Sequence, residues 1–220
     1  MNREDGYFLA GPGDVAAALE ALGGADAVSL ALLTGDTRRR LLAAARRGAW
    51  RPARAVVGSG DNVVRQDMEV CSEFPGASPF RALARRFQAL VEDAAARLGE
   101  ELFATPLRLD DLVLQRYRAG ALGITPHRDG LRYVNLAALF TLSGEARFCL
   151  CAGRDGSGVR EVDAAPGTVI LLRAPGFRGG TERPFHFVCD IRARRYSFGL
   201  RQLAPRDEPE SDRGGAAQGA

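Results

Sequence analysis

Residues Leu112 to Asp129, LVLQRYRAGALGITPHRD, end in a histidine and a carboxylate two positions apart, His127 and Asp129. If the backbone is extended there, alternation along the strand puts both side chains on one face. The chain has one other histidine, His186, which lies in the apolar run RPFHFV. Two histidines and one carboxylate would cover one face of an octahedral ion and leave the opposite positions open, so we predict that these side chains bind a metal.

The predicted metal ligands also have an ordinary explanation. A His-x-Asp sequence can lie on a surface without a metal, and a histidine in an apolar run can be a hydrogen-bonded core residue. His186 lies far from His127 in the sequence, but antiparallel strands can bring such positions together. The residue patterns alone leave both explanations open.

A second pattern lies near the end of the chain, where residues 194–201 read RRYSFGLR. Alternation puts Arg195, Ser197, Gly199 and Arg201 on one face of a strand. Two arginines and a serine make a poor barrel interior unless an anion binds there, and a guanidinium can hold a carboxylate at two points. The alternative is that this face is exposed to solvent on an edge strand.

Two further polar residues belong to the same prediction. Tyr117 precedes His127 by ten residues, and Gln115 shares its face if this segment is a strand. The tyrosine hydroxyl could donate a hydrogen bond to the same anion. A plain packing role for Tyr117 is the alternative.

The composition is ordinary for a globular protein, with 46% hydrophobic and 26% charged residues in a chain of 220. The formal net charge of +3 is mild, and all 30 basic residues are arginine because the sequence contains no lysine. This excludes mechanisms that need a lysine amine as nucleophile or Schiff base. No apolar stretch approaches the roughly 18 residues that span a bilayer, and the first residues lack the order of a secretory signal. We therefore expect a cytoplasmic protein with no membrane partner.

The four cysteines, Cys71, Cys149, Cys151 and Cys189, form no CxxC pair and are too few for a disulfide framework. Cys149 and Cys151 would share a strand face, and we expect both to be small buried hydrophobic residues. The alternative is that they add soft ligands to a metal.

The local patterns predict helices first and strands afterwards. Helices are expected from Asp14 to Gly24, from Asp36 as cap to Gly48, and from Ser78-Pro79 to about Leu98. Residues 27–33 form an apolar run that fits either a strand or a buried helix.

From Leu109 onward, short β-rich pieces alternate with Gly, Pro, Asp and Ser clusters, which is typical of a sandwich or barrel. We therefore predict one α+β domain over residues 1–203, with helices outside a β-sandwich or barrel. Residues 204–220 have almost no apolar side chains and are predicted to be a disordered tail.

Together, these motifs resemble those of the Fe(II)- and 2-oxoglutarate-dependent dioxygenases over roughly Asp110 to Leu203. The motif order is Gln115-x-Tyr117, Gly120, His127-x-Asp129, His186, Arg195-x-Ser197 and Arg201. Within that superfamily the AlkB-like branch is the most similar, since it carries an Asn-x-Tyr before its His-x-Asp and a late Arg-x-Asn-x-x-x-Arg strand. Gln115 and Ser197 stand where that branch has asparagines.

The resemblance implies a double-stranded β-helix, or jelly roll, over residues 110–203, with helices of the N-terminal half packed outside. It also implies that His127, Asp129 and His186 hold Fe(II). A metal site of this kind needs neutral imidazoles and an ionised carboxylate.

The resemblance further implies that 2-oxoglutarate chelates the iron through its keto-acid end. Its far carboxylate would lie at Arg195, assisted by Tyr117 and Ser197. Gln115 and Arg201 would belong to the same cofactor site, with Arg201 nearer the metal. The implied reaction hydroxylates, or oxidatively dealkylates, a substrate C–H bond and releases succinate and CO2.

Substrate choice is expected to come from the segment that covers the open end of the roll, residues 56–79. Phe74 is its only aromatic residue, and Trp50 lies shortly before it. Enzymes that flip a base usually stack it between aromatic or apolar side chains, and this segment offers few aromatic side chains for that role. We therefore expect a small molecule, an amino acid or a protein side chain as substrate, with a nucleic acid as the alternative.

Five arginines flank the expected mouth and either bind an anionic substrate or are simply solvated: Arg128, Arg132, Arg173, Arg178 and Arg183. Two rival functions fit the same residues. One is a non-catalytic β-barrel protein that binds a carboxylate, with structural histidines. The other is a cupin-type metalloenzyme that uses another divalent ion.

Overall fold

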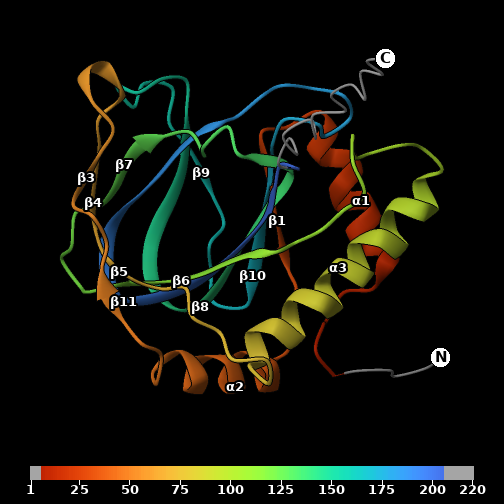
Figure 1. Cartoon of the computed structure of the whole chain (residues 1–220), viewed down its shortest axis with the longest axis horizontal. Coiled ribbons are helices and arrows are strands. Elements are labelled where there is room, and N and C mark those ends of the chain that lie inside the picture. Colours follow the sequence, from red (N-terminus) through yellow and green to blue (C-terminus); the bar gives the residue numbers. More distant parts are fainter. Residues whose placement is uncertain (1–5, 206–220) are drawn as a thin grey trace, which may run out of the picture.

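The structure, a computed structural model, describes residues 6–205 of the chain. Three α-helices and a set of antiparallel strands make up this part (Figure 1). The helices are α1 (Pro12–Gly23), α2 (Gly35–Ala45) and α3 (Pro79–Leu98), with a short 3-10 helix at Gly60–Asn62. The strands are β1 (Ala27–Ala31), β2 (Arg51–Pro52), β3 (Val56–Val57), β4 (Val64–Asp67), β5 (Glu69–Cys71), β6 (Asp111–Tyr117), β7 (Gly123–His127), β8 (Tyr133–Cys151), β9 (Arg160–Val162), β10 (Thr168–Arg173) and β11 (Phe185–Leu203).

The helix starts differ from the sequence prediction in two places. Helix α1 begins before Asp14, whose carboxylate accepts a hydrogen bond from the Gly11 backbone N–H at 2.9 Å. The prediction that Asp36 caps α2 is wrong. Thr34 is the cap, because its hydroxyl lies at the extended position just before the helix and accepts from the Thr37 N–H at 3.3 Å.

The prediction for α3 is confirmed. Ser78 caps it, its hydroxyl accepting from the Phe80 N–H, and Gly99 ends it in the left-handed conformation with φ 67°. The apolar run at residues 27–33, which fitted strand or helix, contains strand β1. The tail predicted to be disordered, residues 204–220, lies almost wholly outside the described residues.

Two long strands organise the sheet. Strands β8 and β11 have 19 residues each and pair with one another over most of their length. One layer has the order β1-β10-β8-β11-β6-β5-β2, while β9 pairs with the other end of β8, and β7 and β4 continue from the other end of β11. Their pairing is irregular around Gly144 of β8, which has φ 90° and where a Cβ atom would lie 2.3 Å from the Arg194 carbonyl oxygen. A mostly antiparallel sheet with few helices fits the predicted jelly roll.

Alternate residues of these strands belong to two separate hydrophobic clusters. Leu136 and Phe140 of β8 share one cluster with Leu19 of α1 and Phe87 of α3. This outer cluster therefore lies between the sheet and the helices, which flank it in Figure 1. Leu139 of β8 belongs to the second cluster, together with residues of β6, β7, β9 and β10.

The second, inner cluster lines the side of the sheet where the polar residues of β11 are buried. Tyr117 belongs to this cluster, and Arg195, Ser197 and Arg201 are buried on the same strand face, each less than 9% exposed. The alternative that this face is exposed on an edge strand is therefore wrong, because β11 is flanked by β6 and β8. No helix in residues 6–205 combines the length and apolar character needed to cross a bilayer.

Candidate metal centre

The three predicted metal ligands converge from two strands and a loop. His127 is the last residue of β7 and pairs directly with His186, the second residue of β11. Their ring centroids lie 4.3 Å apart, and Asp129 follows in the loop after β7. The potential ligand atoms of His127, Asp129 and His186 all lie within 4.8 Å of one another. A single ion can therefore contact all three.

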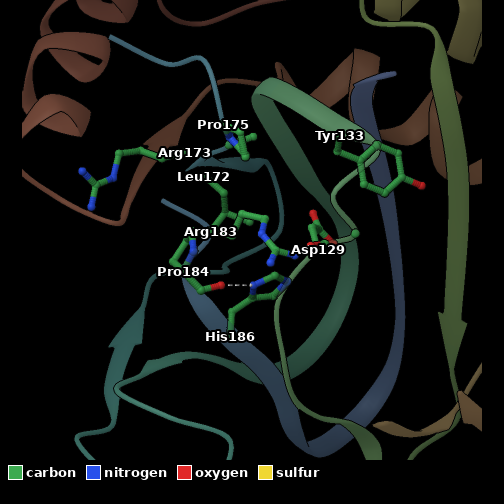
Figure 2. A pocket seen from close by; sticks show the side chains of 10 residues that line it. Asp129, Tyr133, Leu172, Arg173, Pro175, Arg183, Pro184 and His186 are labelled. Atoms are coloured by element: carbon green, nitrogen blue, oxygen red, sulfur yellow. Dashed lines mark hydrogen bonds between the residues drawn. The ribbon is translucent and has the colours of Figure 1, made fainter. Parts of the chain in front are cut away.

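Both imidazoles are oriented in the same way. The Nδ1 atom of His127 lies 2.9 Å from the Thr125 carbonyl oxygen, and that of His186 lies 3.1 Å from the Pro184 carbonyl oxygen (Figure 2). A carbonyl oxygen only accepts, so each Nδ1 carries the proton and each Nε2 keeps a lone pair. Backbone partners of this kind are the usual outer support of metal-binding histidines.

The protonation states also suit a metal. Burial lowers the pKa of His127 to about 3, helped by the neighbouring His186, and burial lowers the pKa of His186 as well. Both imidazoles are therefore neutral near pH 7. Neutral imidazole nitrogens and an ionised carboxylate are the donors that a divalent transition metal requires, so the residues present fit the predicted ion.

Asp129 owes its charge to Arg201. The Nε atom of Arg201 donates to Oδ2 of Asp129 at 2.8 Å, and Nη2 donates to Oδ1 at 3.3 Å. Burial works toward a higher pKa of the carboxyl, but the Arg201 charge and hydrogen bonds outweigh it and hold the pKa of Asp129 well below its usual range. The position of Arg201 near the metal ligands agrees with the prediction. Its part in binding a cofactor stays a prediction.

Arg195 lies on the same strand face but has no acidic partner. It is 2% exposed, donates to the Ser197 hydroxyl at 3.0 Å and to the Thr141 hydroxyl at 3.2 Å, and its Nε atom has no hydrogen-bond partner. Burial lowers the pKa of this guanidinium. Within residues 6–205 no carboxylate forms an ion pair with Arg195. Arg195 is therefore a buried cation whose charge is not balanced by a described acidic side chain.

The other predicted cofactor residues surround Arg195. Tyr117 pairs with Arg195 across β6 and β11, and the guanidinium carbon lies 5.7 Å from the centroid of the Tyr117 ring. Burial raises the pKa of Tyr117 to about 12, so its hydroxyl keeps its proton. Ser197 in turn donates to Gln115 at 3.2 Å. Thr141 escaped the sequence prediction, because a single threonine in the apolar run VNLAALFTL resembles any strand residue.

The five flanking arginines fall into two groups. Arg173 and Arg178 form ion pairs with Asp26 and Glu100, and Figure 2 shows Arg173 pointing away from His186. The hypothesis that these two bind substrate is therefore not supported. The other three, Arg128, Arg132 and Arg183, remain close to the metal ligands in sequence or in space, and Arg183 lines a small cavity that His186 and Asp129 also line.

The aromatic residues considered for base stacking lie on the wrong face. Phe74 packs against Phe198, with centroids 5.9 Å apart, and Trp50 packs edge-on against Tyr196. Both residues pack against the outer, helix-side cluster. Part of segment 56–79 lies beside the strand that carries His127, since Gln66 and Asp67 of β4 pair with Ile124 and Gly123 of β7.

The cysteines are separate from the ligand cluster. Cys149 is buried, as expected for a small hydrophobic residue, whereas Cys151 is partly exposed. Neither belongs to the group of potential ligands formed by His127, Asp129 and His186.

No family model and no curated protein sequence matches the chain. Solved structures do match. A prolyl hydroxylase from Trichoplax adhaerens, in complex with a hypoxia inducible factor peptide fragment, superposes with a TM-score of 0.65 at 14% identity, covering 87% of this chain and 90% of that one. A 2OG-Fe(II) oxygenase family protein from Burkholderia pseudomallei has a TM-score of 0.59 at 16% identity, covering 88% and 91%.

A third similar structure is the non-heme alpha ketoglutarate dependent epimerase SnoN from nogalamycin biosynthesis, with a TM-score of 0.60 at 20% identity and coverage of 85% and 83%. At identities this low, the likeness concerns the arrangement of helices and strands. The chain therefore has the fold found in oxygenases that depend on Fe(II) and 2-oxoglutarate.

Proposed function

We propose that this protein is an Fe(II)- and 2-oxoglutarate-dependent oxygenase that hydroxylates, or oxidatively dealkylates, a substrate C–H bond and releases succinate and CO2. One observation carries the proposal. A cluster of two neutral histidines and a carboxylate, with ligand atoms within 4.8 Å of one another, accompanies the buried guanidinium of Arg195, which has no acidic partner within residues 6–205.

His127, Asp129 and His186 would hold the ion and leave the opposite positions open. When bound, Fe(II) with 2-oxoglutarate supplies the oxidising chemistry, and the protein supplies orientation and a dry environment. Arg201 keeps Asp129 ionised and fixes its direction through two hydrogen bonds. The Thr125 and Pro184 carbonyl oxygens hold the two imidazoles with Nε2 free.

Arg195 would bind the far carboxylate of 2-oxoglutarate. A buried charge without a partner is costly, so the folded chain gains most at this position from an anion. The Tyr117 ring and the Ser197 and Thr141 hydroxyls limit the directions that the guanidinium can take. Tyr117, with its proton retained, and Gln115 complete the polar surroundings of this carboxylate.

The test begins with anaerobic protein, Fe(II) and 2-oxoglutarate. A weak visible charge-transfer band is expected when the keto acid chelates the iron, followed by succinate release once air is admitted. Asp129→Ala should abolish both signals, whereas Asp93→Ala, which removes an exposed carboxylate of α3, should leave them unchanged. A wild-type protein without the band belongs to one of the rival classes, a carboxylate-binding protein or a cupin-type metalloenzyme.

For the substrate, we favour a small molecule, an amino acid or a protein side chain. One similar structure is a hydroxylase in complex with a peptide, which makes a peptide substrate chemically reasonable for this fold. The AlkB-like alternative, a nucleic-acid dealkylase, rests on the motif order alone. The outer-face packing of Phe74 and Trp50 argues against it, because neither ring can stack a base at the metal.

A further inference from the structure

Arg183 is a cation at the metal centre that the proposed chemistry leaves unused. It lies three residues before His186, and its Nη1 atom donates to the backbone carbonyl oxygen of Asp129 at 2.8 Å. In Figure 2 the guanidinium points toward Asp129 and His186 from the other side of the small cavity. Arg183 is partly buried and, within residues 6–205, forms no ion pair with a carboxylate.

The surroundings of Arg183 are rich in positive charge. Arg128 stacks on Phe185, with its guanidinium carbon 4.2 Å from the ring centroid, and has no ion pair with any described residue. Arg154 approaches the same ring at 5.6 Å and donates only to carbonyl and amide oxygens. Arg173 and Arg178, in contrast, have acidic partners. The unpaired positive charge therefore lies around Phe185, the residue before His186.

The charge balance of the loaded site points the same way. Asp129 and the dianion 2-oxoglutarate would bring three negative charges, against four positive charges from a divalent ion, Arg195 and Arg201. Both histidines are neutral. Asp111, an acid whose charge acts on Arg201, accepts from the Tyr133 hydroxyl and also faces Arg132. Arg183 therefore adds to an excess of positive charge that the described side chains do not offset.

We propose, building on the function proposed above, that the substrate is a small organic acid whose carboxylate binds Arg183. The carboxylate replaces the Asp129 carbonyl oxygen as acceptor, and a charge-assisted bond is stronger than the neutral one it replaces. Leu172 and Pro175 line the cavity and offer an apolar wall for the hydrocarbon part. The cavity has a volume of only about 10 Å³ in this structure, so an acid can enter only when lining side chains such as Arg183 move.

The first measurement compares matched probes. N-acetyl amino acids as free acids, each paired with its primary amide, are tested for stimulation of succinate release above the rate without substrate. At least one acid should stimulate, and its amide should do so at least about 10-fold less, since a charged hydrogen bond is lost. If the protein releases succinate, then equal stimulation by the amides, stimulation by alkylated oligonucleotides alone, or no stimulation by any acid overturns the proposal.

The second measurement assigns the effect to Arg183. In Arg183→Gln the KM for the stimulating acid should rise about 10- to 100-fold more than the KM for 2-oxoglutarate, and Arg183→Lys should recover part of the loss. Arg178→Gln removes an arginine of the same loop that pairs with Glu100, and should change neither constant. A parallel rise of both constants in Arg183→Gln would indicate a general disturbance of the metal ligands and contradict the proposal.

The third measurement separates this proposal from the proposed function. Thermal unfolding of the purified full chain is followed with each acid and amide, without added iron or 2-oxoglutarate. Acids should raise the Tm of the wild type more than that of Arg183→Gln, even if the chain releases no succinate. Equal shifts in both proteins overturn the Arg183 site, whereas missing iron chelation in the wild type contradicts only the oxygenase proposal.

Discussion

The inner face of β11 contains two arginines in opposite situations. Arg201 and Arg195 alternate onto one face and are both almost fully buried. Arg201 is paired with Asp129, whereas Arg195 contacts only neutral hydroxyls and a tyrosine ring. The first arginine thus pairs with a proposed metal ligand of the protein itself, and the second has no acidic partner among the described residues. A sequence pattern cannot tell these roles apart, but the charge that each guanidinium faces can.

The largest effect should come from removing Arg201, the arginine that pairs with Asp129. Arg201→Met leaves Asp129 as a buried carboxylate without its partner, which costs about 3–5 kcal/mol. The free energy of unfolding of the metal-free protein, measured with denaturant and chelator, should fall accordingly. Arg147→Met, which breaks an exposed pair with Glu161, serves as the control and should change little. Similar losses in both variants would mean that the Asp129 pair is not special.

Removing Arg195 should change the stability in the opposite direction. Arg195→Met removes a buried charge that has no acidic partner, so the metal-free protein should be as stable as the wild type or more stable. The KM for 2-oxoglutarate should nevertheless rise about 10- to 100-fold, because charge-assisted hydrogen bonds to the carboxylate are lost. Succinate release at varied 2-oxoglutarate, together with denaturant unfolding, checks both halves. A clear loss of stability would show that Arg195 has a structural role instead.

Acid should reduce the folding stability through the buried histidines and leave the surroundings of Arg195 unaffected. Burial lowers the pKa of His127 to about 3, whereas a histidine in the unfolded chain titrates near pH 6.5. The unfolded metal-free chain therefore binds more protons between about pH 6.5 and pH 3. Stability is fully present above this window and falls with pH inside it, by up to about 1.4 kcal/mol per pH unit for each such histidine.

Denaturant unfolding at pH 7, 6 and 5 measures this slope, and His127→Gln should make it shallower. A variant with the wild-type slope would assign the acid sensitivity to other groups.

The smallest effect is expected for the hydroxyl that sequence reasoning missed. Thr141→Val keeps the shape of the side chain but removes the acceptor of the Arg195 Nη2 donor. The KM for 2-oxoglutarate should rise about 3- to 10-fold, in line with the loss of one hydrogen bond to a charged group. An unchanged KM would mean that Thr141 only fills space beside the arginine.

Local patterns predicted most of what depends on local chemistry. The His-x-Asp spacing linked His127 with Asp129, although Asp129 lies in the loop after β7 and not on the strand. Strand alternation grouped Arg195 with Ser197, and the Ser78-Pro79 start of α3 follows from capping. The partners of the charged groups could not be predicted from the sequence, because ion pairs such as Arg173–Asp26 join residues far apart in the sequence. The packing of Phe74 on the outer face could not be predicted either, since it depends on the path of the chain between β5 and α3.

Strand β11 carries His186 near one end and Arg195 farther along the same continuous backbone. The span from the proposed ion to the Arg195 guanidinium would therefore be set largely within one strand. In the proposed oxygenase, this spacing would favour a five-carbon keto diacid over its shorter and longer homologues. Inserting or deleting a residue in the irregular stretch between Cys189 and Tyr196 would change the length of acid that fits.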